Sequence, residues 1–306
     1  MKSIKKLAPR QVTAVLYGLI VLAAGCSSGT PTSAAEINNI RISRDELELT
    51  LVELSDAGQT PIVDGEVKGD TARSVLTALV QGQATLQLLD IYGQSITDAD
   101  RDAVRSSLSQ NSDTSEFTEH LKTLIVDLNA GTIALKRITA PDVKKAAEMY
   151  ERAPASLGVM CVRHIVVKTL DEANNLLGKI GATGEDFATL AGTFSIEPNA
   201  KQSGGALTGA NNACMKLSEY QTSFDADFTA GALKAKPGIA SGPVKSSFGY
   251  HIIYVRPFVE VAPDISTLLA TDPGELLLTG FIATSKINID SAYGRWNAAS
   301  GSIIAN

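Results

Sequence analysis

Residues 241–255 read SGPVKSSFGYHIIYV, a turn-rich opening that runs into an alternating apolar stretch. The β-branched and aromatic residues from Tyr250 to Val255 predict a strand. His251 lies inside that strand, between a tyrosine and two isoleucines. A buried imidazole needs hydrogen-bond partners on its ring nitrogens, so this position predicts a second polar group close by.

A second strand with a histidine is predicted upstream, at Val159 to Lys168 (VMCVRHIVVK), where His164 is the polar residue among apolar ones. This composition is typical of a strand buried on both faces. The two histidines can be each other's partner if their strands are adjacent and both side chains lie on one face. Alternatively, each satisfies a separate backbone group. The third histidine, His120, lies in a polar-rimmed helix, and we expect it at the surface.

Four segments around these strands resemble, in order, the parvulin family of peptidyl-prolyl isomerases. They are CVRHIVV at 161–167, EDFATLAGTFSIEP at 185–198, SGGALTG at 203–209 and SGPVKSSFGYHII at 241–253. The last segment is the most specific, and the resemblance covers residues 159–258. It implies an α+β fold for this part of the chain: a parvulin-like domain with a small antiparallel sheet and surrounding helices.

The resemblance also implies a site. His164 and His251 match the paired histidines of the family, which lie in a hydrogen-bond network at the floor of the site. Glu197 stands where family members carry cysteine or aspartate; it either joins the histidine network, where burial would raise its pKa, or points to solvent. The Gly-Gly turn departs from the family pattern at Ala206 and Thr208.

Four apolar residues match the positions that would hold the substrate proline: Leu207, Phe224, Phe228 and Phe248. Phe224 and Phe228 are four residues apart, and on one helix this spacing places both rings on the same face. Ordinary core packing is the alternative for this pair. Phe248 falls beside the second histidine, where the family has serine or an aromatic residue.

The activity implied by the resemblance is rotation about X-Pro peptide bonds, whose barrier is about 18 to 20 kcal/mol. No bond is broken in that reaction. A catalyst needs an apolar pocket that favours the twisted amide, so no nucleophile, metal or cofactor is expected. The alternative is a non-catalytic chaperone, a holdase with a vestigial parvulin domain. A hydrolase is disfavoured because no serine or cysteine lies in a nucleophile elbow.

The N-terminus reads as a targeting segment. Residues 1–25 combine a basic start with a short apolar run, and Ala23-Ala24-Gly25-Cys26 resembles the cleavage site of a bacterial lipoprotein signal peptide. We expect Cys26 to carry a lipid anchor that holds the protein at the extracytoplasmic face of the cell membrane. An ordinary secretory signal is the alternative. Residues 26–35 are rich in Ser, Thr and Ala and predict a flexible tether.

The flanks of the parvulin-like region predict a second, α-helical domain at residues 36–155. Ser43 as N-cap with Glu46 three residues later forms a capping-box pattern. Further helices are expected from Asp70, Thr97, Thr114 and Thr139. INNIRISRDEL at 37–47 resembles the entry to the chaperone region of extracytoplasmic foldases of the PrsA and SurA type. In that arrangement the C-terminal segment, residues 259–306, packs back on the helical domain.

The foldase resemblance implies unfolded or partly folded secreted polypeptides with X-Pro bonds as partners, and a homodimer is possible. Nucleic acid is not expected as a partner. The chain carries a net charge of −6, and its first 25 residues hold four bases and no acid, so the remainder carries −6 − 4 = −10 and would repel phosphates. Outside the cytoplasm, Cys161 and Cys214 can pair as a disulfide. Two free thiols are the alternative. Three scattered histidines without paired-ligand spacing do not indicate a metal site.

Overall fold

The structure is a computed structural model that describes residues 33–60, 62–63, 66–111, 113–181, 184–209 and 212–306. The predicted signal peptide, the predicted lipid attachment at Cys26 and most of the predicted tether lie outside these residues. The prediction of a flexible tether is wrong for its last three residues, 33–35. Residues Ser33–Ile37 form strand β1, in which Ala34 and Ala35 are buried, because the strand pairs with a neighbour on each side.

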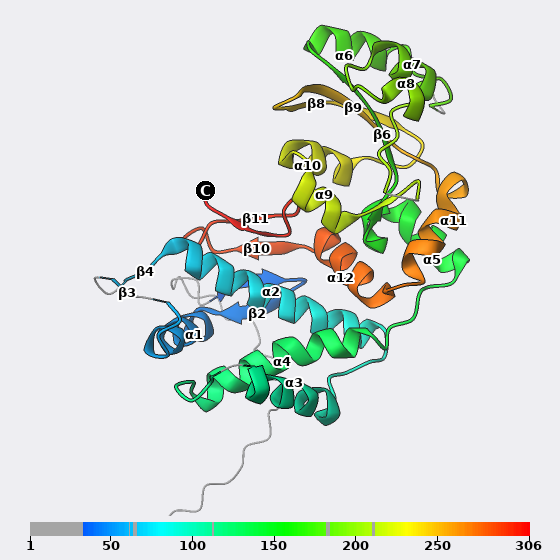
Figure 1. Ribbon diagram of the computed structural model, residues 1–306. Helices are drawn as coiled ribbons and strands as arrows, with labels where there is room; N and C mark the ends of the chain where they lie inside the picture. The colour runs from blue at the N-terminus through cyan, green and yellow to red at the C-terminus, as the bar shows by residue number, and fades with distance from the viewer. Residues whose placement is uncertain (1–32, 61, 64–65, 112, 182–183, 210–211) are drawn as a thin grey trace, which may run out of the picture. The chain divides into compact units, whose positions relative to one another are not determined.

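The sheet of the parvulin-like region has three antiparallel strands in the order β6-β9-β8. They are β6 (Val162–Val167), β8 (Ala240–Ser246) and β9 (Gly249–Val255). Helices α6 (Leu170–Leu177) and α7 (Phe187–Phe194) cover one face, and α10 (Ala226–Lys234) covers the other, as Figure 1 shows. The sequence predicts β6 and β9. It does not predict β8, whose serines, glycine and proline read as a turn.

The strand predicted at 159–168 is interrupted at Cys161. Residues Val159–Met160 form β5, which pairs with β7 (Met215–Lys216), and the chain then enters β6. Cys161 and Cys214 are joined by a disulfide at this point, and both are fully buried. The bridge therefore ties the start of β6 to the segment that leads into β7.

Phe224 and Phe228, which the sequence spacing would place on one helix, are separated by a helix break. Helix α9 (Leu217–Ser223) ends with Phe224 as its C-cap, and Asp225 then caps the N-terminus of α10. The Asp225 carboxylate accepts hydrogen bonds from the backbone N–H groups of Asp227 and Phe228. Aspartate is favoured at the N-cap, and its extended backbone breaks the helix at that residue. Phe224 and Phe228 thus belong to different helices.

The N-terminal part of the chain is mainly helical. Its helices are α1 (Arg44–Asp56), α2 (Gly69–Ile91), α3 (Asp98–Asn111), α4 (Glu119–Leu135) and α5 (Val143–Arg152), followed by the 3-10 turn η1 (Pro154–Leu157). A short hairpin, β3 (Ile62–Val63) and β4 (Glu66–Val67), separates α1 from α2. Ser43 caps α1 as predicted, through the Glu46 backbone N–H. Helix α4 begins five residues after the predicted Thr114, and α5 begins four residues after the predicted Thr139, because Thr118 and Asp142 are the residues that cap them.

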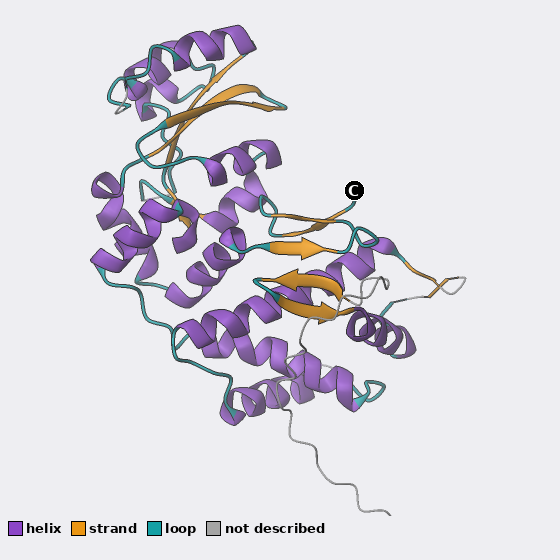
Figure 2. Ribbon diagram, turned by 180° about the vertical axis from the view of Figure 1, so that it is seen from behind, coloured by secondary structure: helices purple, strands orange, loops and turns teal. Residues whose placement is uncertain are grey.

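The C-terminal segment adds α11 (Phe258–Leu269), α12 (Pro273–Thr284) and strands β10 (Ile287–Ile289), β11 (Arg295–Asn297) and β12 (Ser302–Ile304). Strand β10 pairs with β1, and β1 pairs with β2 (Ile40–Ser43), which makes a sheet from both ends of the described chain. Figure 2 shows these strands together. Ile303 and Ile282 are buried in the same core as Leu47 and Leu76. The C-terminal segment therefore completes the hydrophobic core of the helical part.

None of the helices in the described part of the chain is long and apolar enough to cross a membrane.

Candidate active site

The two strand histidines meet. Nδ1 of His164 lies 3.2 Å from Nδ1 of His251, and the two rings stack with an interplanar angle of 11°. The register explains the contact: Val166 of β6 pairs with His251 of β9, so His164 is the diagonal neighbour on the same face. Both side chains are buried. The site therefore rests on adjacent strands that the disulfide and the sheet hold in place.

Ser246 of β8 supplies the second partner of His251. Its Oγ lies 2.7 Å from His251 Nε2 and accepts a hydrogen bond from the backbone N–H of Phe248. Because the Ser246 oxygen already accepts that N–H, its own hydroxyl proton is free to donate to the imidazole. When the Ser246 hydroxyl donates to Nε2, His251 carries its proton on Nδ1 and donates it to His164.

The remaining ring nitrogen of His164 faces Glu197. His164 Nε2 is buried and has no hydrogen-bond partner in the part of the chain that the structure describes, and Oε2 of Glu197 lies 3.9 Å away. If His251 donates through Nδ1, His164 carries its proton on Nε2, and that N–H points toward the carboxylate. The Glu197 side chain is 44% exposed, so it stands at the mouth of the site rather than in its floor. Ser195 fixes the Glu197 loop to β6 by accepting the backbone N–H groups of Val166 and Glu197.

Burial keeps the histidine pair uncharged. Desolvation, with the neighbouring His251 as a second cause, lowers the pKa of His164 to about 4. Desolvation also lowers the pKa of His251, although the negative charge of Asp225 opposes that shift. Both rings are therefore neutral at pH 7 and form a polar but uncharged floor.

Among the described residues, no group of three or more His, Cys, Asp or Glu side chains is placed to hold a metal ion.

Aromatic rings cover the histidine pair. Phe228 of α10 has its ring centroid 5.4 Å from that of His164 and 5.0 Å from that of His251. Phe224 lies 5.7 Å from Phe228 and stacks on Tyr220 at 4.8 Å. The expectation that Phe224 and Phe228 share a helix face is wrong, because Asp225 ends one helix and starts another, yet the two rings still meet.

Leu207 enters the same neighbourhood through the Gly-Gly turn. Its backbone N–H donates to the Val162 carbonyl, and the His164 N–H donates to the Gly205 carbonyl. Gly205 has φ +75°, and a Cβ there would lie 2.3 Å from the His164 carbonyl oxygen, so only glycine fits this close approach. The turn therefore forms although Ala206 and Thr208 differ from the family pattern.

Phe248 is placed differently from the other predicted site residues. It sits at the tip of the β8–β9 hairpin with 72% of its surface exposed. The structure therefore brings together His164, His251, Phe228 and Phe224, with Leu207 on the adjoining turn and Glu197 at the mouth, and leaves Phe248 in solvent.

Sequence reasoning missed the residues that position the pair. Asp225 caps α10 through one carboxylate oxygen and accepts the N–H and O–H of Ser247 with the other, at 3.2 and 2.9 Å. This joins the helix that carries Phe228 to the hairpin that carries Ser246. An aspartate before a predicted helix is a recognisable cap signal. The roles of Ser246 and Ser195 depend on tertiary contacts and leave no local signal.

This geometry has a counterpart among known families. Residues 166–257 match the family model described as a rotamase, the PPIC-type PPIase domain. These residues form a PPIC-type rotamase domain. The match includes His251 and begins two residues after His164, on the same strand. Outside it, the chain is a mixed helix and sheet protein, in agreement with the α+β fold expected from the sequence.

Relatives of this rotamase domain include foldases. A foldase protein PrsA of Clostridium kluyveri is 40% identical over 129 residues, which are 39% of this chain and 35% of that protein. A foldase protein PrsA of Clostridium botulinum is 27% identical over 297 residues, or 84% of this chain and 85% of that one. The crystal structure of PrsA from Bacillus subtilis shares 20% identity, with a TM-score of 0.28, over 82% of this chain and 92% of that chain. The chain thus spans about a third of the length of the first of these relatives.

Proposed function

We propose that this chain is a peptidyl-prolyl cis-trans isomerase that acts on X-Pro bonds of unfolded or partly folded polypeptides. The observation that carries the proposal is the contact between His164 and His251 under the ring of Phe228, inside a rotamase domain. A rotamase domain with this pair in contact does not favour the alternative of a vestigial domain that only holds clients.

The chemistry follows from the polarity of the site. A planar amide owes its rotation barrier to charge-separated resonance, and a twisted amide loses that charge separation. Uncharged imidazoles and phenylalanine rings offer little to stabilise the planar form, so they shift the balance toward the twisted one. Each 1.36 kcal/mol of that preference gives about a tenfold rate increase.

Two groups act on the substrate in this proposal. Phe228, with Leu207 and Phe224 beside it, contacts the proline ring. The Nε2 atom of His164 and the Glu197 carboxylate, 3.9 Å apart, flank the place where the substrate carbonyl rotates. No covalent intermediate is needed.

A protease-coupled assay on a short Xaa-Pro peptide tests the activity. We expect acceleration at micromolar protein and a loss of about tenfold or more in His251→Ala and Phe228→Ala. Lys168→Gln, an exposed lysine on the same domain, is the matched control and keeps the full rate. Absence of acceleration by the folded wild-type chain would refute the proposed activity.

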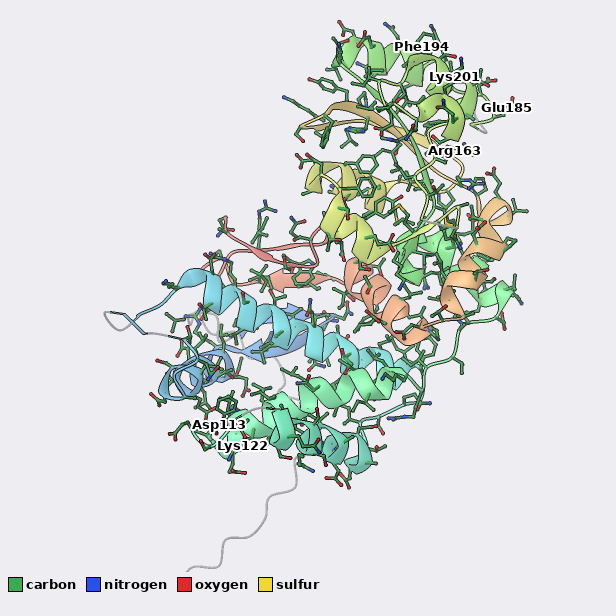
Figure 3. All side chains as sticks on the ribbon, in the orientation of Figure 1. Asp113, Lys122, Arg163, Glu185, Phe194 and Lys201 are labelled. Atoms are coloured by element: carbon green, nitrogen blue, oxygen red, sulfur yellow. A yellow bond between two sulfur atoms is a disulfide. The ribbon has the colours of Figure 1, made fainter. Side chains whose placement is uncertain are left out.

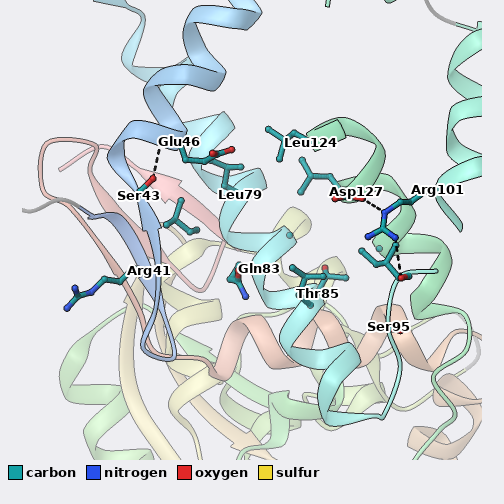
Figure 4. A pocket seen from close by; sticks show the side chains of 16 residues that line it. Arg41, Ser43, Glu46, Leu79, Gln83, Thr85, Ser95, Arg101, Leu124 and Asp127 are labelled. Atoms are coloured by element: carbon teal, nitrogen blue, oxygen red, sulfur yellow. Dashed lines mark hydrogen bonds and ion pairs between the residues drawn. The ribbon is translucent and has the colours of Figure 1, made fainter. Parts of the chain in front are cut away.

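The foldase part of the proposal concerns the mainly helical N-terminal part of the chain, here called the helical lobe. A hollow of about 650 Å³ opens between β2 and α4 with α2 beneath it, as Figure 4 shows. Its apolar lining comes from Ile42, Leu79, Leu86, Leu124 and Leu128. Leu86 is exposed. The rest of the lining is polar and includes Arg41, Glu46, Arg101 and Asp127. The hollow is therefore suited to holding a chain segment with both nonpolar and polar side chains while its prolines isomerise.

Leu86→Glu tests that role. Placing a charge in the hollow should reduce the suppression of aggregation of an unfolded client severalfold and leave peptide isomerisation unchanged. Leu49→Glu changes a leucine of equal exposure on α1, outside the hollow, and serves as the control. Equal chaperone activity in both variants would contradict the assignment of the hollow.

We further propose that the chain works outside the cytoplasm, anchored to the cell membrane through a lipid on Cys26. The lipobox-like order at residues 23–26 and the buried disulfide support this location. Mass spectrometry of the mature N-terminus tests it: an unmodified or uncleaved Cys26 would contradict the anchor. The possible homodimer stays a prediction, for which sedimentation analysis is the test.

A further inference from the structure

A second hollow lies in the rotamase domain, away from the histidine pair. It has a volume of about 500 Å³ and is formed by the start of β6, the middle of α7 and the short helix α8 (Ala200–Ser203). Arg163 and Lys201 line it, and no acidic residue is among the lining residues that the structure describes. The chain as a whole has 33 acidic and 27 basic residues, so a hollow with two cations and no acid departs from its average surface.

Arg163 is held in position without an acidic partner. Its Nη1 donates to the carbonyl oxygens of Ser203 and Gly204, at 3.2 and 3.1 Å. In the described part of the chain, no carboxylate lies within ion-pair distance of its guanidinium. A guanidinium has five N–H donors in a fixed fork, and the edge not used by the two carbonyls has no partner among the described residues. Burial, with the charge of Arg256 as a second cause, lowers the pKa of Arg163, although the negative charge of Glu260 opposes that shift.

The nearby acids do not line the hollow. Arg256 itself is paired with Glu260 at 3.3 Å. The carboxylates of Glu185 and Asp186 lie beside Gly181, before α7 begins, and neither lines the hollow. Figure 3 labels Arg163, Lys201 and Glu185 in this region.

The other side chains of the hollow are neutral hydrogen-bonding groups. Thr189 and Thr193 come from α7, and Gln202 and Ser203 come from α8. Lys201 is exposed and makes no ion pair with any described residue. Its ammonium and the free edge of Arg163 therefore present two positive groups among neutral donors.

We propose that this hollow binds carboxylate groups of an acidic polypeptide segment, with Arg163 as a forked contact and Lys201 as a second cation. A planar carboxylate matches the free edge of a guanidinium, with two parallel N–H···O hydrogen bonds. Side chains alternate along a strand, so Arg163 and His164 point to opposite faces of β6. An acidic segment thus binds on one face while a proline of the same chain occupies the other. This site goes beyond the proposed isomerase activity and does not depend on it.

Calorimetric titration of the full chain with a capped hexaglutamate peptide tests the site, with capped hexaglutamine as the neutral probe. Neither peptide contains proline, so failure of the isomerase proposal leaves this test valid. We expect hexaglutamate to bind and hexaglutamine not to bind. The affinity for hexaglutamate should fall about tenfold or more between low salt and 0.3 M salt, because the contacts are charged.

Substitutions locate the binding. Lys201→Glu should abolish hexaglutamate binding, and Arg163→Gln should weaken it about tenfold. Because Arg163 also holds the Gly-Gly turn, Lys201→Glu at the exposed position is the variant that keeps the test independent of folding. Lys168→Gln removes an exposed, unpaired lysine of the same domain outside the hollow and should leave the affinity unchanged.

Three results would overturn the proposal. They are equal binding of hexaglutamate and hexaglutamine, unchanged hexaglutamate affinity in Lys201→Glu, and displacement of hexaglutamate by an equal concentration of inorganic phosphate. The last result would assign the hollow to a free oxyanion rather than to an acidic chain.

Discussion

His251 has a hydrogen-bond partner at each ring nitrogen. Its Nε2 receives the Ser246 hydroxyl, and its Nδ1 faces His164. When the Ser246 hydroxyl donates to Nε2, the two rings take the tautomers in which His251 donates through Nδ1 and the His164 N–H lies at Nε2, toward Glu197.

Ser246→Ala removes that hydroxyl. We expect the isomerase rate to fall about fivefold, because one hydrogen bond contributes roughly 1 kcal/mol and its loss releases the tautomer of His251. Nitrogen NMR of the imidazoles checks the cause: the His251 Nε2 signal should change from one tautomer to an averaged position. Ser241→Ala, on the same strand, is the control. An unchanged rate with an unchanged spectrum would contradict the assigned role.

His120 is a residue whose placement the sequence did not predict. It was expected at the surface, but its side chain is half-buried between two carboxylates of α1, with Nδ1 2.6 Å from Glu53 and Nε2 3.3 Å from Glu46. The hydrogen bond to Glu53 raises the pKa of His120, against the effect of burial. Burial opposes ionisation of Glu53, but hydrogen bonds from His120 and Thr118 outweigh it and lower the pKa of that carboxyl.

The pair therefore stabilises the fold in a limited pH range. The stability gained from His120 is fully present below its ordinary pKa of 6.5. It is lost as pH rises through the raised pKa that His120 has in the folded protein. The stability gained from Glu53 is present above its ordinary pKa of 4.5. It is lost as pH falls through the lowered pKa that Glu53 has in the folded protein. Urea denaturation of His120→Gln should show a loss of about 1 kcal/mol near pH 5.5 that shrinks toward pH 9. A loss of equal size at both pH values would contradict the ion pair.

At the scale of elements, the position of α10 against the sheet determines where Phe228 lies. Gly231 allows the close approach, because a Cβ there would lie 2.6 Å from Val244 Cγ2 and 3.1 Å from Ile253 Cδ1. Nothing in the local sequence marks this glycine, since the contact exists only once β8 and β9 are in place.

Gly231→Ala should destabilise the rotamase domain by about 1 to 3 kcal/mol and lower its isomerase rate, although alanine is the better helix former by about 1 kcal/mol. Gly178→Ala, at the end of α6, meets only ordinary contacts and should be neutral or stabilising. Urea denaturation of both variants measures the difference. Equal stability of the two variants would show that α10 has room to shift.

The sequence predicted those helices and strands whose hydrophobic pattern is regular. Strands β6 and β9 were predictable because their apolar side chains are buried on both faces. Strand β8 was not, because it is half-exposed and rich in turn-forming residues. Helix α11 contains Pro263, which obscures a helical pattern, and the break at Asp225 separated two helices that the spacing of Phe224 and Phe228 had joined.

At the scale of the whole molecule, the two ends of the described chain are paired in one sheet. Sequence patterns cannot specify such a pairing, because β1 and β10 are more than 240 residues apart and both are short. The resemblance to foldases predicted that the C-terminal segment packs back, and the structure supplies the register, Ala35 with Ile289 and Ile37 with Ile287.

Deleting residues 286–306 should therefore destabilise the helical lobe by at least about 2 kcal/mol. The deletion removes the partner strand of β1 and exposes the core that Ile303 covers. Hydrogen exchange should show faster exchange in β1 and α2 than in the full chain, with β6 and β9 little changed. Uniform protection across the chain after deletion would contradict this division of the core.

The most direct measurement is cis-trans exchange of a short Xaa-Pro peptide, followed by NMR with a catalytic amount of the full chain. We predict exchange cross-peaks that are absent for the peptide alone, that persist with Lys168→Gln, and that vanish with His164→Ala or Phe228→Ala in chains whose melting shows them folded. Exchange no faster than that of the free peptide in the presence of folded wild-type chain, or exchange of equal rate in the His164→Ala and Phe228→Ala chains, would contradict the assignment of this histidine pair as a prolyl isomerase site.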